Sequence, residues 1–86
     1  MPEVSRFFGI VIYIYYNEHQ PPHFHATYNE YEALVSIETL AIIAGYLPPK
    51  ATGLVMEWAT IHHDDLIKVW QQAINRAPLD KIEPLK

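Results

Sequence analysis

Two histidines placed two residues apart are the part of this sequence with the clearest chemical potential. His23 and His25 follow a pair of prolines, in a segment whose aromatic and β-branched residues favour a strand. Side chains alternate between the two faces of a strand, so both imidazoles should point to the same side. Together they could offer two nitrogen ligands to a divalent metal such as zinc.

A metal site would need a third ligand, and the sequence leaves its source open. The candidates are the other histidines and two adjacent aspartates: His19, His62, His63, Asp64 and Asp65. No cysteine is present, and no H-E-x-x-H pattern occurs. The alternative interpretation is that the imidazoles bond only to backbone groups or tyrosine hydroxyls, in which case no cofactor is expected.

General acid–base catalysis is a second chemistry that the histidines could support. His62 or His63, followed by two aspartates, could form an oriented imidazole that titrates near neutral pH. The sequence offers few nucleophiles, because cysteine is absent and the serines are Ser5 and Ser36. A histidine next to an aspartate on a helix is more often part of a solvated surface, so this chemistry stays an alternative.

Arg6 is the candidate residue for nucleic-acid contact. It stands beside two phenylalanines, and with the rings of Tyr13 and Tyr15 it could form a surface on which bases stack. However, the net charge is −4, and the 6 Lys and Arg residues are scattered along the chain. Phosphate binding usually needs a basic patch, so contact with RNA or DNA stays an open alternative.

The composition predicts a single domain, residues 1–86, with more apolar surface than it can bury. Apolar residues make up 50% of the chain and charged residues only 19%. A domain of this size has a small core, so some apolar side chains should stay on the surface and favour self-association. The longest apolar run, residues 7–16, is too short to cross a bilayer. With no basic leader at the start, we expect a cytoplasmic protein without a membrane partner.

Four strands and one helix are expected. Alternation and β-branched content predict strands at residues 4–16, 23–28, 31–37 and 40–44. Apolar residues at steps of three and four then predict one long helix up to about residue 76, which Pro78 ends. The fold class is therefore α+β: an antiparallel meander of three to four strands with one long C-terminal helix packed on one face.

One helix can cover only one face of such a sheet. The residues expected against the helix include Phe8, Ile10, Ile12 and Ile14. The reverse face should carry an interface set of apolar and aromatic side chains: Phe7, Val11, Tyr13, Tyr15 and Leu34. Because exposed apolar patches mark interaction sites, we predict a homodimer or another protein partner on this face.

Several short signatures together resemble a bacterial family of small proteins of unknown function. They include S-R-F-x-G-I and P-P-H-F-H-A motifs and extend over nearly the whole chain, at residues 5–12, 21–26, 37–40, 45–48, 57–59 and 81–85. The resemblance implies a small protein partner encoded by the adjacent gene, and some members of the family are labelled toxin–antitoxin components. It brings no catalytic residues. His63 departs from the family pattern, which more often has a basic residue there.

Two functions are expected on these grounds. The first is a small cytoplasmic interaction protein, one component of a toxin–antitoxin-like pair with a neighbouring small protein. The second is a histidine-dependent, metal-binding hydrolase or ribonuclease. The two functions require different geometries. A metal ion shared by the two histidine segments requires those segments to lie together in space, whereas the interaction protein does not.

Overall fold

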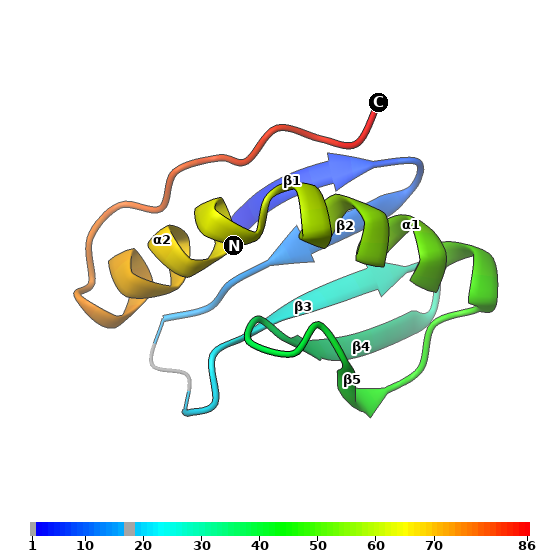
Figure 1. The fold of residues 1–86 in the computed structure, drawn as a ribbon, viewed down its shortest axis with the longest axis horizontal. Helices are drawn as coiled ribbons and strands as arrows, with labels where there is room; N and C mark the ends of the chain where they lie inside the picture. The colour runs from blue at the N-terminus through cyan, green and yellow to red at the C-terminus, as the bar shows by residue number, and fades with distance from the viewer. Residues whose placement is uncertain (1, 17–18) are drawn as a thin grey trace.

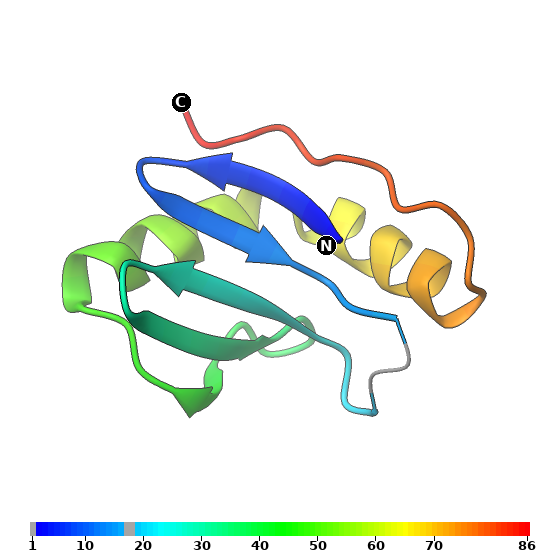
Figure 2. The same ribbon diagram turned by 180° about the vertical axis from the view of Figure 1, so that it is seen from behind.

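The computed structural model describes residues 2–16 and 19–86. Within them, five strands form one antiparallel sheet in chain order: β1 (Glu3–Phe7), β2 (Ile10–Tyr13), β3 (His23–Tyr28), β4 (Tyr31–Ser36) and β5 (Ile42–Gly45). The described residues also form two helices, α1 (Pro49–Ile61) and α2 (His63–Ile74). Both helices lie on one side of the sheet (Figure 1). The other side faces the viewer without a helix in front of it (Figure 2). The predicted α+β meander is confirmed, with one more strand and one more helix than expected.

The first predicted strand, residues 4–16, is in fact a hairpin. Phe7 pairs with Ile10, and the two residues between them have positive φ angles, 50° at Phe8 and 81° at Gly9. Positive φ at both central residues is what a type I′ hairpin turn requires. The sequence hides this turn because apolar, strand-forming residues continue through it.

This turn reverses the predicted faces of two phenylalanines. Cross-strand partners share a face of the sheet, so Phe7 points to the core side with its partner Ile10. The Phe7 ring is 5% exposed and lies 5.4 Å from the ring of Trp58, whereas Phe8, expected in the core, is 60% exposed. The prediction that Phe7 belongs to the interface set on the reverse face is therefore wrong, because its side chain lies in the core.

The remaining strands follow the predicted order with small shifts. Tyr28 pairs with Tyr31 across a two-residue turn in which Asn29 has a φ of 54°. The last strand begins at Ile42, two residues later than predicted, because the backbone N–H of Leu40 donates to the carbonyl of Ser36 and closes a turn there. The β4–β5 pairing contains a register shift, because Leu34 pairs with Ala44 and Val35 with Ile42, which leaves Ile43 of β5 as an extra residue.

The predicted long helix is bent at His62. This residue has φ −108° and ψ 28°, outside the helical region, and separates α1 from α2. Hydrogen bonds still run through it, since its N–H donates to the Trp58 carbonyl and its own carbonyl accepts from Leu66, both at 3.0 Å. The break is therefore a bend between two packed helices, with no loop between them.

A single apolar core lies between the sheet and the helices. Its largest fully buried side chain is Trp58 of α1, which contacts the ring of Phe24 on β3 as well as Phe7. Isoleucines of β2 and its extension, Ile10, Ile12 and Ile14, are buried there as the alternation predicted. Among the described residues, no helix is long and apolar enough to cross a lipid bilayer.

The C-terminal segment runs along the outer edge of β1 (Figure 2). The N–H of Ile82 donates to the Val4 carbonyl at 2.7 Å, and the indole N–H of Trp58 donates to the Glu83 carbonyl at 2.8 Å. Asp80 accepts a hydrogen bond from Gln72 and pairs with Lys68, and these contacts lower the pKa of its carboxyl. The segment thus protects one edge of the sheet from pairing with another chain.

Candidate functional site

The two histidines of β3 lie side by side, as their spacing predicted. The ring centroids of His23 and His25 are 5.3 Å apart. His23, at the first position of the strand, is only 6% exposed and also lies 5.3 Å from the ring of Trp70 on α2. Its Nδ1 lies 2.8 Å from the Pro21 carbonyl oxygen, which can only accept, so this nitrogen carries a proton.

A carboxylate orients the second imidazole. The Nδ1 of His25 is 3.0 Å from Oε2 of Glu32, which lies diagonally across the β3–β4 pairing. A hydrogen bond to an ionised carboxylate requires a proton on Nδ1, so the neutral ring has its basic lone pair on Nε2. This is the arrangement that a general base needs.

Two tyrosines extend the group across the sheet. The ring of Tyr15 meets His25 edge-on with centroids 4.6 Å apart, and Tyr13 stacks on Tyr15 at 5.8 Å. We call Tyr15, His23, His25 and Glu32 the histidine cluster. The cluster lies at the end of the sheet where β3 begins, and aromatic contacts join it to the middle of the reverse face.

The reverse face itself consists of partly exposed side chains. We call this surface the outer face; it comprises Val11, Tyr13, Tyr15 and Leu34, four members of the predicted interface set. Register supports their common orientation, since Tyr13 pairs with His25 and His25 pairs with Leu34. The histidine cluster and the outer face are therefore one continuous surface.

Arg6 is exposed, but its guanidinium is paired. Its Nη2 and Nε donate to the two carboxylate oxygens of Glu3, at 2.9 and 3.2 Å. This hydrogen bonding, together with the attraction between the charges, raises the pKa of Arg6 and lowers the pKa of Glu3. A phosphate would have to compete with Glu3 for Arg6, which weakens the case for a nucleic-acid site there.

The second histidine segment has partners of its own in the helical layer. The Nδ1 of His62 lies 3.3 Å from Oδ2 of Asp65, and its ring lies 5.9 Å from that of Trp58. His63 donates from Nε2 to the Ile37 carbonyl at 2.7 Å and so connects α2 to the loop after β4. Each has a structural contact that accounts for its position in the fold.

The proposed metal ligands do not assemble around one point. Residues 2–16 and 19–86 contain no group of three or more His, Asp or Glu side chains that could hold a metal ion. His19 is exposed in the connection before β3. His23 and His25 would supply two ligands to a metal, and the described residues add no third.

Glu32, which bonds to His25, and Trp70, which contacts His23, were not among the site residues expected from the sequence. A signal for Glu32 was present, because a two-residue turn after Tyr28 fixes the register and places Glu32 close to His25. No comparable signal existed for Trp70, whose contact with His23 depends on how α2 packs against the end of the sheet.

Comparison with known proteins gives one result about the family. A family model described as a domain of unknown function (DUF4160) matches residues 9–71. This range includes β3, the histidine cluster and most of both helices. No curated protein and no solved structure matches the chain. The chain belongs to the DUF4160 family of domains of unknown function.

Proposed function

We propose that this chain is a protein–protein interaction module that binds a second polypeptide through its outer face. The observation that carries the proposal is the arrangement in two layers. The helices cover one face of the sheet and leave the other without a helix (Figures 1 and 2). That other face presents the partly exposed tyrosine and aliphatic side chains of the outer face. Tyrosine-rich, weakly charged surfaces are typical of the centres of protein interfaces.

The partner that we propose is the small protein encoded by the adjacent gene, in a pair of the toxin–antitoxin type. The family resemblance of the sequence supports this choice, as does the low proportion of charged residues, 19%. A second copy of the chain is the other occupant that the outer face could accept. A stable interface buries about 800 Å² on each partner, which is a large part of one face of a domain this small.

Leu34→Lys is the substitution that should break this complex. Leu34 lies on the outer face beside His25, so a lysine there would place an unpaired ammonium at the centre of the interface. We expect the natural chain to co-elute with the neighbouring protein in size-exclusion chromatography after co-expression. The variant should bind at least about tenfold more weakly, because a buried, unpaired charge costs more than about 1.4 kcal/mol.

Ile67→Lys is the matched control for this experiment. Ile67 is an equally aliphatic, partly exposed side chain, but it belongs to α2 in the helical layer. The Ile67→Lys substitution should leave the complex intact. Two separate peaks for the natural proteins, or equal weakening by both substitutions, would rule out the outer face as the binding surface. For a toxin–antitoxin pair, co-expression should also change host growth, and Leu34→Lys should remove that change.

The histidine cluster supports a second candidate, cleavage of RNA by general acid–base catalysis. The observation in its favour is the hydrogen bond that Nδ1 of His25 donates to Glu32, which fixes the tautomer whose basic lone pair is on Nε2. His25 would remove the proton of a ribose 2′-hydroxyl, whose oxygen attacks the phosphorus. Because Nε2 of His23 is buried, a solvent water would give a proton to the departing 5′-oxygen, and a cyclic phosphate would remain.

The test is the rate of cleavage of a single-stranded RNA by purified variants. His25→Ala should lower the rate about 100-fold, the lower end of the range for a lost general base. Glu32→Gln should have a smaller effect, since it removes only the orienting carboxylate. The exposed His19 is the matched control, and His19→Ala should leave the rate unchanged. Equal rates for His25→Ala and the natural chain would exclude this activity.

A further inference from the structure

Phe8 occupies a position in the first hairpin that does not suit it. Its φ of 50° lies in the left-handed region, which favours Gly and Asn and which bulky residues rarely adopt. Its ring is also 60% exposed, so burial in the core does not offset the backbone strain. Strained residues of this kind often occur at functional sites, where the strain serves a purpose other than stability.

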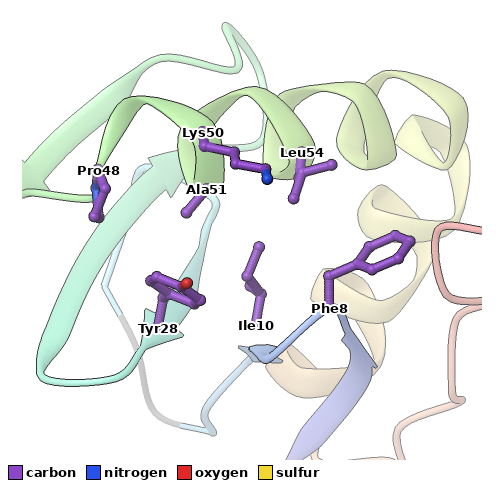
Figure 3. A pocket seen from close by; sticks show the side chains of 7 residues that line it. All are labelled: Phe8, Ile10, Tyr28, Pro48, Lys50, Ala51 and Leu54. Carbon is purple, nitrogen blue, oxygen red and sulfur yellow. The ribbon is translucent and has the colours of Figure 1, made fainter.

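The exposed ring forms one wall of a pocket at the end of the sheet where this hairpin turns. The pocket has a volume of about 390 Å³, within the range of small-molecule sites. Side chains of the sheet face those of α1 and its preceding residue across the opening (Figure 3). The residues that line the pocket are Phe8, Ile10, Tyr28, Pro48, Lys50, Ala51 and Leu54.

The charged member of this lining is Lys50. Its side chain extends along α1, so that its ammonium lies over the gap between the helix and Ile10 (Figure 3). The first turn of α1 contains no acidic residue. Among the residues that the structure describes, Lys50 forms no ion pair. A protein with a net charge of −4 therefore keeps an uncompensated cation beside an apolar pocket.

From these observations we propose that the pocket binds a small amphiphilic anion, such as a medium-chain carboxylate. The apolar body of the ligand packs between the rings of Phe8 and Tyr28 and the side chain of Leu54. The carboxylate pairs with the ammonium of Lys50. This site lies between the sheet and α1, on the opposite side of the sheet from the outer face, and it is independent of the proposed protein partner.

Titration of the full chain with octanoate and with 1-octanol, followed by NMR of the backbone amides, tests the proposal. Octanoate should bind in a saturable way, with shifts concentrated at the pocket. Lys50→Gln should weaken octanoate binding about three- to fivefold, the upper part of the range for an exposed ion pair, and should leave 1-octanol binding unchanged. Lys68→Gln on α2 is the charge control and should change neither affinity.

Phe8→Asn provides the second variant, and it should not compromise folding. Asparagine followed by Gly9 is the preferred pair for this turn, so the melting temperature should rise by about 4 °C or more. The same variant should weaken octanoate binding about tenfold, because the aromatic wall is lost. Non-saturable octanoate binding, equal affinity for 1-octanol, or unchanged affinity in Phe8→Asn would each overturn the proposal.

Discussion

Trp58→Ala is expected to lower the free energy of unfolding by about 3–5 kcal/mol, the range for a buried tryptophan. Trp58 is fully buried and lies between two phenylalanine rings, Phe7 at 5.4 Å and Phe24 at 5.8 Å. Its indole N–H also holds the C-terminal segment through Glu83. Because small domains have only about 5–15 kcal/mol of stability in total, this single change removes a large part of it. Urea unfolding followed by circular dichroism measures the loss.

A pair of conservative variants separates packing from hydrogen bonding at this residue. Trp58→Phe keeps a ring in the core but removes the donor to Glu83, whereas Trp70→Phe removes an indole N–H that has no hydrogen-bond partner among the described residues. Trp58→Phe should therefore cost about 1 kcal/mol more than Trp70→Phe. It should also speed hydrogen exchange at the amide of Ile82, which bonds to Val4. Equal losses in the two variants would show that the C-terminal segment does not depend on the Trp58 donor.

Gly45→Ala should be the most damaging change of a single methyl group in this sheet. Gly45 has a φ of 80°, and an added Cβ would lie 2.2 Å from the carbonyl oxygen of Glu32 and 3.0 Å from Cα of Ala33. Both neighbours are backbone atoms of β4, so they cannot move aside without disturbing the β4–β5 pairing. We expect a loss of about 3 kcal/mol, from the strained φ and the steric overlap together.

Gly53→Ala is the control, and its effect should have the opposite sign. Gly53 lies on the exposed side of α1, and its added Cβ would meet no described atom within 4 Å outside the local helix backbone. Alanine at this position should stabilise the protein by about 0.5–1 kcal/mol, because glycine loses more backbone freedom in a helix. Thermal unfolding of both variants gives the comparison directly. A Gly45→Ala variant as stable as the natural chain would mean that β5 does not lie against β4 as described.

The central part of the fold could be predicted from local patterns. Alternation at residues 23–28 and 31–37 placed His23 beside His25 and gave the Tyr28–Tyr31 turn, because period-two side chains and a short polar turn fix the register. The same alternation placed Ile10, Ile12 and Ile14 in the core. These features depend on neighbouring residues in the chain, which a sequence contains explicitly.

The first hairpin could not be predicted in the same way. Phe8 and Gly9 lie within an uninterrupted apolar run, and a turn-forming pair would ordinarily contain Asn or Asp before the Gly. Reading through the turn reversed the faces of Phe7 and Phe8. A two-residue turn pairs Phe7 with Ile10 on one face of the sheet, whereas alternation along a continuous strand would put residues 7 and 10 on opposite faces, so one missed turn produced both errors.

The apolar spacing alone does not predict the bend at His62. The apolar spacing continues from α1 into α2, so the pattern predicts one helix. The actual break depends on packing of both helices over the same sheet face and on the hydrogen bond from His63 to Ile37, 26 residues away. Contacts across such distances have no counterpart in local periodicity.

By itself, the sequence determined the α+β class, the antiparallel order of the strands and the adjacency of the two β3 histidines. Tertiary structure decided how those histidines are used: Glu32 orients His25, Trp70 covers His23, and the second histidine segment bonds elsewhere. It also created the pocket between Phe8 and Lys50. The physical reason is that propensity and alternation act between near neighbours, whereas a site is made where packing brings distant residues into contact.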